Sequence, residues 1–189
     1  MTETPNPYIV DTDSLTGEMH PIRRVVLALG SNLGERFTAL QGAINALADT
    51  PDVFITGVSP VYETEPVDSP DGSGPYLNAV VLADTTLPAA RIMERALAIE
   101  DAFERERTHS RNAPRTLDVD LIVVGDRRAN EPSMRLPHPR AHERAFVLQP
   151  WYDVEPDAVF PDRGPIADLL AAADASTIKR REDLTLDVE

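Results

Sequence analysis

The sequence predicts an α+β domain built in the order β-α-β-β-α-β, with an antiparallel sheet. Short apolar runs of strand length alternate with two longer stretches whose apolar residues recur at helical spacing. Two loops rich in Pro, Gly, Ser and charged residues separate these stretches. The 189 residues, of which 42% are hydrophobic, are enough for one well-filled domain. This order of elements is the ferredoxin-like plan, here with extra C-terminal elements.

The first half of the chain supplies a strand, a helix and a second strand. The run RRVVLALG is a short apolar strand closed by glycine, and SNLGERFTALQGAINALADT is the helix that follows. Ser31 or Asn32 is expected to cap this helix. The run VFITGVSPVYET is the second strand, which Ser59 and Pro60 interrupt. The apolar stripe of the helix consists of Phe37, Leu40, Ile44 and Leu47.

The second half repeats the pattern. The third strand is YLNAVVLAD, and a helix opens near Pro88, where proline suits the first turn. The fourth strand is expected over Arg115–Val124, and a short helix over Ile166–Ala173. The stripe of the second long helix consists of Ile92, Ala96, Ile99 and Phe103.

The chain is expected to hold one domain between two tails. Residues 1–21 carry three prolines, four acidic residues and no lysine or arginine, which indicates a disordered N-terminal tail. Residues 22–175 form the predicted single domain, and residues 176–189 an acidic C-terminal tail.

Composition excludes several classes of function. The net charge of −14 argues against a nucleic-acid or anionic-membrane surface. Without cysteine there is no disulfide, thiolate zinc site or cysteine nucleophile. No signal peptide or membrane span is recognisable, so a cytoplasmic location is expected. Nine of the 17 arginines nevertheless fall between Arg105 and Arg144, and this local concentration suggests a small polyanionic ligand.

Two aspartates are set into the fourth strand. Asp118 and Asp120 are two residues apart, so both side chains point to one face with Cα atoms about 6–7 Å apart. An edge strand with a solvated face is the ordinary explanation, but Leu121–Val124 continues as an apolar run typical of a strand buried on both faces. A divalent cation would turn the mutual repulsion into shared attraction. Oxygen ligands without nearby His or Cys favour Mg²⁺, which usually binds together with substrate phosphates.

Other residues fit a nucleotide and a heterocycle. Arginine offers a planar fork of donors that matches phosphate oxygens, although a solvated charged loop is the alternative. Tyr76 and Asn78 share a face of the third strand, and could stack on a heterocycle and pair with its polar edge. His138, between two prolines, is either a turn residue or a phosphate or ribose contact. The arginines just upstream of the aspartate pair are Arg105, Arg107, Arg111 and Arg115.

Four segments together resemble a known family. ALGSNLG, PYLNAVV, APRTLDVDLIVV and LPHPRAHERAFVLQPW occur in the order and approximate spacing of the 6-hydroxymethyl-7,8-dihydropterin pyrophosphokinases of folate biosynthesis. The resemblance runs from about Arg24 to about Pro161, and PRTLDVD is its most specific element. It implies the ferredoxin-like fold and transfer of the β,γ-diphosphate of ATP to the pterin hydroxymethyl oxygen, which leaves AMP. A monomer is expected.

The resemblance also implies a set of site residues. Two Mg²⁺ ions with ATP are matched to Asp118 and Asp120. Arg105, Arg111 and Arg115 are matched to catalysis, Arg105 and Arg111 as loop arginines that approach the phosphates. The matched ATP contacts are Glu100, Arg107, Arg115, Leu121, His138 and Arg144. The matched pterin contacts are Thr64, Val67, Tyr76, Asn78 and Phe146. Asn112 stands where many members carry tryptophan, which affects the packing of that loop.

Two other functions remain open at this point. A non-catalytic ferredoxin-like ligand-binding module would need neither the paired aspartates nor four adjacent arginines. A different Mg²⁺-dependent nucleotidyl transferase is disfavoured by the aromatic and amide residues Tyr76, Asn78 and Phe146. The nucleotide product discriminates among the three.

Overall fold

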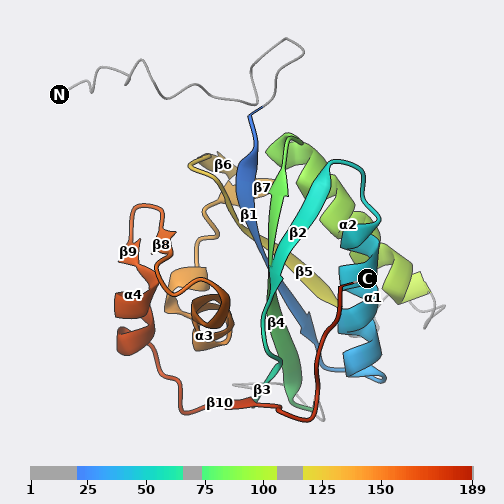
Figure 1. Cartoon of the computed structure of the whole chain (residues 1–189), viewed down its shortest axis with the longest axis vertical. Helices are drawn as coiled ribbons and strands as arrows, with labels where there is room; N and C mark the ends of the chain where they lie inside the picture. Colours follow the sequence, from blue (N-terminus) through green and yellow to red (C-terminus); the bar gives the residue numbers. More distant parts are fainter. Residues whose placement is uncertain (1–20, 66–73, 106–116, 189) are drawn as a thin grey trace.

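The computed structural model describes residues 21–65, 74–105 and 117–188 (Figure 1). The strands of the main sheet are β1 (Arg23–Ser31), β2 (Val53–Val58), β3 (Tyr62–Thr64), β4 (Tyr76–Thr85), β5 (Asp118–Val124) and β10 (Ile178–Arg180). The helices are α1 (Arg36–Ala48), α2 (Ala89–Arg105), α3 (Ala145–Val154) and α4 (Ile166–Ala172), with a 3-10 turn at Ala141–Glu143. Two small hairpins pair β6 (Ala129–Glu131) with β7 (Met134–Leu136) and β8 (Val159–Phe160) with β9 (Gly164–Pro165).

The main sheet is antiparallel at every pairing. Its path is β10-β3-β4-β1-β5, and β2 also pairs with β4. The central strands β1 and β4 are buried along nearly their whole length, which is why their sequences show apolar runs without alternation. The predicted mixture of helices with an antiparallel sheet is confirmed.

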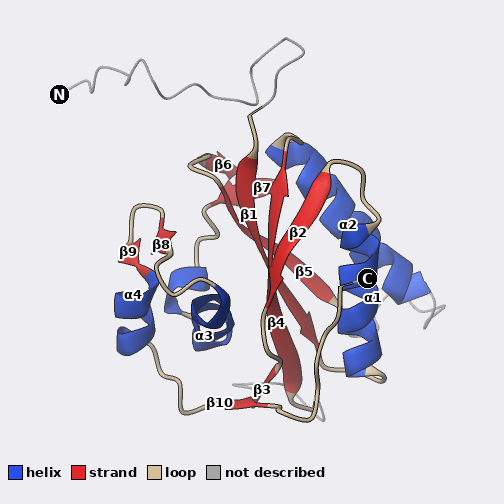
Figure 2. Cartoon of the chain, viewed as in Figure 1, coloured by secondary structure: helices blue, strands red, loops and turns tan. Residues whose placement is uncertain are grey.

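Helices cover both faces of this sheet (Figure 2). α1 and α2 lie on one face, and α3 with α4 lies on the other. The two faces carry separate clusters of buried side chains, one beneath each helix layer. The predicted helix stripes are confirmed, since Leu40, Ile44 and Leu47 of α1 and Ile92, Ala96 and Ile99 of α2 are buried in the first cluster.

The expected cap of the first helix is wrong. α1 begins at Arg36, and its capping position is Glu35, whose side chain makes no capping bond. Ser31 still belongs to β1, because pairing with β4 continues as far as Ser31 opposite Leu77. Gly34, with φ of 62°, then supplies the left-handed turn that leads into the helix.

The other element bounds are close to those predicted. The second strand is interrupted as expected, and both its parts, β2 and β3, pair with β4. The fourth strand begins at Asp118, whereas Arg115 lies outside the described residues. The short helix ends at Ala172, one residue earlier than expected.

The residues expected as an acidic tail make extensive contacts. β10 pairs with β3, and the chain then runs back along the sheet to end beside α1 (Figure 1). Leu186 is only 8% exposed and belongs to the cluster between the sheet and α1. Asp187 exchanges two hydrogen bonds with Gln41 of α1. In the described part of the chain, no helix is long and apolar enough to cross a membrane.

Candidate active site

The register of the central strands sets two polar groups on opposite sides of a glycine. Gly30 of β1 lies opposite Asn78 of β4 and also opposite Asp118 of β5. Cross-strand partners point to the same face, so the amide and the carboxylate flank a position that has no side chain. A Cβ atom added at Gly30 would lie 3.3 Å from Asn78 Oδ1. The missing side chain therefore leaves a low floor between the two groups.

The next row along the strands again has a carboxylate on the β5 side, but an apolar residue on the β4 side. Ala28 of β1 lies opposite Val80 of β4 and Asp120 of β5. Both middle positions are small, and two interstrand spacings of roughly 5 Å separate β4 from β5. The floor thus has an amide and aromatic side on β4 and a carboxylate side on β5.

A cavity of about 540 Å³ lies over this floor. Its size is that of a small-molecule site. Besides β1, β4 and β5, its walls come from the end of β3, the start of α3 and the chain before β10. Its lining residues are Ala28, Leu29, Gly30, Thr64, Glu65, Tyr76, Asn78, Asp118, Asp120, Glu143, Arg144, Ala145, Phe146, Asp174 and Thr177.

The amide of Asn78 is held by its neighbour on β3. Asn78 Nδ2 donates a hydrogen bond to Thr64 Oγ1 at 2.6 Å, and both residues are buried. An amide has two N–H donors and a carbonyl acceptor, so this bond orients the group without using its full capacity. An oriented amide can read the donor and acceptor pattern of a heterocycle edge.

Two aromatic rings contribute to the same cavity. Tyr76 comes from the first position of β4 and Phe146 from the first turn of α3. The guanidinium carbon of Arg144 lies 5.5 Å from the centroid of the Phe146 ring, within range of a cation–π contact. Burial raises the pKa of the Tyr76 hydroxyl, and the charge of Asp118 raises it further. A flat ring bound between these aromatics would lie beside the Asn78 amide.

The described lining is strongly acidic. Five carboxylates and one guanidinium, that of Arg144, contribute to it. The carboxylates are those of Glu65, Asp118, Asp120, Glu143 and Asp174. A polyanion would be repelled by such a wall unless cations lay between.

The donor set suits Mg²⁺. Among the described residues, no group of three or more His, Cys, Asp or Glu side chains is arranged as a complete metal site. Mg²⁺ does not need one, because it usually binds through one or two carboxylates and completes its shell with water and substrate phosphates. The same-face carboxylates Asp118 and Asp120 fit that requirement.

His138 and Glu100 lie close to the carboxylate side. Burial lowers the pKa of His138, while the charge of Asp120 opposes this shift, which places the imidazole within electrostatic reach of Asp120. The backbone N–H of His138 donates to the carbonyl of Ile122 at 2.8 Å. Glu100 of α2 is buried, and its Oε1 accepts a hydrogen bond from the Val119 N–H at 2.7 Å.

The structure brings together seven of the predicted site residues. Those that line the cavity are Thr64, Tyr76, Asn78, Asp118, Asp120, Arg144 and Phe146. The side chain of Leu121 is buried in the core beneath α1 and α2, so any ligand contact would use its backbone. Val67, Arg107, Arg111 and Arg115 lie outside the described residues, as does the side chain of Arg105.

Several lining residues carry no recognisable signal in the sequence. Glu65, Glu143, Asp174 and Thr177 come from loops, turns and segment ends far apart in the chain, and only the folded structure places them around one cavity. Gly30 had a local signal, the glycine that ends the first strand. Gly30 forms part of the cavity floor because the strand register places it opposite both Asn78 and Asp118.

Comparisons with known proteins place the chain in one family. The family model of 7,8-dihydro-6-hydroxymethylpterin-pyrophosphokinase (HPPK) matches residues 26–156. A protein of Pseudomonas aeruginosa named 2-amino-4-hydroxy-6-hydroxymethyldihydropteridine pyrophosphokinase is 36% identical over 84% of this chain and 97% of its own length. A protein of the same name from Mycobacterium bovis is 40% identical over 78% of this chain and 82% of its own length.

A solved structure shows the same fold. The wild-type HPPK-DHPS of Plasmodium falciparum, crystallised with pterin and p-hydroxybenzoate, superposes with a TM-score of 0.62 at 14% identity. The match covers 87% of this chain and 46% of that one, so the chain spans about half the length of this structural relative. The family match over most of the described domain, together with the two relatives of the same name, shows that the chain belongs to the 7,8-dihydro-6-hydroxymethylpterin-pyrophosphokinase family.

Proposed function

We propose that this chain transfers the β,γ-diphosphate of ATP to 6-hydroxymethyl-7,8-dihydropterin, giving the pterin diphosphate and AMP. Family membership and the shared name of the curated relatives support the reaction. The observation that carries the assignment to this cavity is the position of Gly30. It separates the oriented Asn78 amide from the Asp118 carboxylate on one floor.

The β4 side of the cavity is assigned to the pterin. Tyr76 and Phe146 supply aromatic faces, and Asn78, oriented by Thr64, supplies donors and an acceptor for the polar edge of the ring. Val67 is assigned to the same subsite from the family resemblance alone. A pterin has a flat heterocyclic ring and an amide-like edge, so its chemistry matches these groups.

The β5 side is assigned to the triphosphate and to two Mg²⁺ ions. Asp118 and Asp120 would hold the ions, which neutralise phosphate charge and polarise the reacting phosphoryl group. His138 lies within electrostatic reach of both Asp120 and Arg144, and the side chains of His138 and Arg144 are assigned to this side. The loop arginines Arg105, Arg107, Arg111 and Arg115, together with Glu100 and Leu121, complete the proposed nucleotide contacts.

The protein's own contribution to the reaction is placement. Held between the aromatic rings, the pterin presents its hydroxymethyl oxygen toward the carboxylate side. That oxygen forms a bond to the β-phosphorus as the bond from the β-phosphorus to the oxygen bridging the α-phosphate breaks, and AMP leaves with that oxygen. The alcohol proton passes to solvent or to Asp120. Positioning and charge neutralisation supply most of the acceleration in phosphoryl transfer.

The ferredoxin-like plan is part of the same proposal. The antiparallel order β5-β1-β4-β2, with a helix after the first strand and another after the third, supports it. This arrangement brings β4 and β5, which lie far apart in the sequence, to the two sides of β1.

The substitution Asn78→Ala tests the pterin assignment. Loss of the amide leaves the polar edge of the ligand unpaired, at a cost of about 1–3 kcal/mol. We expect the dissociation constant of the pterin to rise while that of an ATP analogue stays unchanged, each measured by calorimetry. Asn130→Ala, in the β6–β7 hairpin, is the control. If instead the ATP analogue binds more weakly and the pterin does not, Asn78 belongs to the other subsite.

A further inference from the structure

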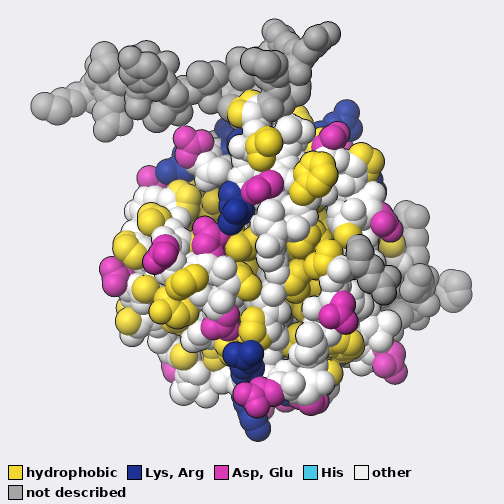
Figure 3. Space-filling view, in the orientation of Figure 1, with side chains coloured by type: hydrophobic (Ala, Val, Ile, Leu, Met, Phe, Trp, Pro, Cys, Tyr) yellow, Lys and Arg dark blue, Asp and Glu magenta, His cyan; other side chains and the backbone are white. Residues whose placement is uncertain are grey.

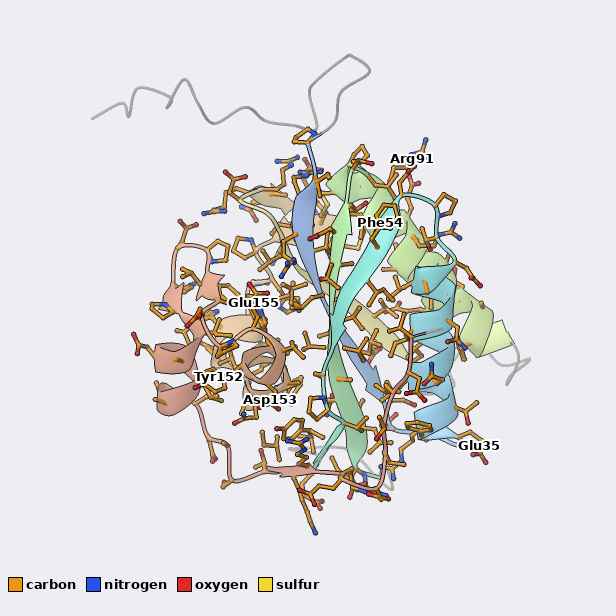
Figure 4. All side chains as sticks on the ribbon, in the orientation of Figure 1. Glu35, Phe54, Arg91, Tyr152, Asp153 and Glu155 are labelled. Carbon is orange, nitrogen blue, oxygen red and sulfur yellow. The ribbon has the colours of Figure 1, made fainter. Side chains whose placement is uncertain are left out.

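β3 lies between β4 and β10 on the pterin side of the cavity, and side chains on both of its faces make contacts with other elements. Tyr62 and Thr64 alternate with Glu63 along this strand. The Tyr62 hydroxyl donates to Asp153 Oδ2 of α3 at 2.5 Å, while Thr64 accepts from Asn78. Figure 4 labels Asp153 and its sequence neighbour Tyr152 on α3. On this face β3 is therefore tied to α3 and to the cavity.

Glu63 points the other way and binds two arginines. Its Oε2 accepts from Arg36 Nη1 of α1 at 3.1 Å and from Arg181 Nη1 at 2.9 Å. The three side chains are 25–29% exposed, so the cluster is largely shielded from water. Arg181 also pairs through Nε and Nη2 with both oxygens of Asp183. At the end of the molecule where β10 lies, acidic and basic side chains adjoin one another (Figure 3).

Arg36 of this cluster also contacts the residue that precedes Tyr76. Arg36 Nη1 donates to the carbonyl of Pro75 at 2.7 Å. Pro75 immediately precedes Tyr76, whose ring lines the cavity. One arginine thus fixes both β3, through Glu63, and the start of β4.

Backbone bonds join the C-terminal segment to the whole of β3. Arg181 N donates to the Val61 carbonyl at 2.8 Å, and Glu65 N donates to the Thr177 carbonyl at 3.2 Å. Between these bonds, β10 pairs with β3 residue by residue. Thr177 itself lines the cavity. β10 and Arg181 lie beyond the residues matched by the family model, which end at 156.

We propose that Glu63, with Arg36 and Arg181, is a set of positioning residues for pterin recognition, and that the C-terminal segment is a working part of the pterin subsite. The inference rests on the proposed function of the cavity. None of the three residues lines the cavity, so they act through Thr64, Asn78 and Tyr76. Recognition depends on placement to within about 0.5 Å, and supporting residues set that placement.

Three variants separate positioning from mere stability. Glu63→Gln keeps the shape and removes the charge. Arg181→Ala removes the guanidinium that the C-terminal segment contributes to the cluster, and Arg181→Lys keeps a cation there. The control is Arg128→Ala, which breaks an arginine–carboxylate pair with Asp162 in which neither residue lines the cavity. For each, calorimetry measures the dissociation constants of the pterin and of an ATP analogue, and thermal unfolding is followed in parallel.

We expect Glu63→Gln and Arg181→Ala to weaken pterin binding by about 3- to 30-fold, the range for residues that act through others. ATP-analogue affinity should stay within about twofold. Arg181→Lys should recover part of the loss, and Arg128→Ala should bind both ligands normally.

A lower melting temperature with unchanged pterin affinity in both variants would overturn the inference, because the cluster would then serve stability alone. The variant Asn78→Ala, titrated alongside, separates failure of the positioning role from failure of the pterin subsite itself. If Asn78→Ala loses pterin affinity and the cluster variants do not, only the positioning role is wrong. If Asn78→Ala also binds normally, the pterin subsite is misplaced, and the positioning role fails with it.

Discussion

At the scale of single residues, β5 is a largely buried strand that carries two charged side chains, those of Asp118 and Asp120. Asp118 and Asp120 face Gly30 and Ala28, which offer no charged or polar side chain to them. At an effective dielectric of about 20, two carboxylates about 5 Å apart repel by roughly 3 kcal/mol. In the proposed function, bound Mg²⁺ offsets this repulsion.

This arrangement predicts opposite effects on activity and stability. Asp118→Asn or Asp120→Asn should abolish most turnover, because a carboxylate ligand for Mg²⁺ is lost. Without metal, each variant should be as stable as the parent or slightly more so, since repulsion is relieved. Activity is assayed beside melting temperature with and without Mg²⁺-ATP, and Asp101→Asn, on the exposed side of α2, is the control. Near-normal turnover in both variants would remove the metal assignment.

Residue types and spacing predicted two pairs of residues that line the cavity, each pair from one strand. Asp118 with Asp120 and Tyr76 with Asn78 are two apart, and the alternation of a strand is enough to place each pair on one face. The acidic residues Glu143 and Asp174 carry no such signal, since they meet the cavity only through tertiary packing.

At the scale of elements, periodicity identified both long helices but not how closely they pack. Gly42 of α1 faces Phe103 of α2, and a Cβ atom there would lie 2.3 Å from the Cζ of the ring. The helix pattern contained both residues. Only the packing of α1 against α2 shows that glycine makes room for the ring.

Gly42→Ala is therefore expected to destabilise the protein despite the better helix propensity of alanine. Overpacking costs about 1–3 kcal/mol, whereas alanine gains up to about 1 kcal/mol over glycine in a helix. Phe103 is only partly buried and can shift somewhat, so a net loss of about 1 kcal/mol is expected in denaturant unfolding. In a Phe103→Leu background the same substitution should be neutral or stabilising. An equal loss in both backgrounds would show that the ring is not the cause.

At the scale of the whole molecule, the sequence predicted the order of elements but not the full extent of the sheet. Apolar runs identify the central strands, because those strands are buried on both faces. β10 consists of Ile178, Lys179 and Arg180, and two charged residues out of three resemble a solvated tail. Its pairing with β3 is accompanied by the Glu63–Arg181 ion pair, a contact between residues 118 positions apart. No local pattern contains such a contact.

In the proposed reaction, a pterin on the β4 side receives a diphosphate from a nucleotide on the β5 side. The measurement that tests it most directly is the identity of the products formed from ATP, Mg²⁺ and 6-hydroxymethyl-7,8-dihydropterin, followed by phosphorus NMR. We expect AMP and the pterin diphosphate in equal amounts, with no AMP when the pterin is left out. ADP as the nucleotide product, or AMP formed at the same rate without the pterin, would contradict diphosphate transfer to the pterin.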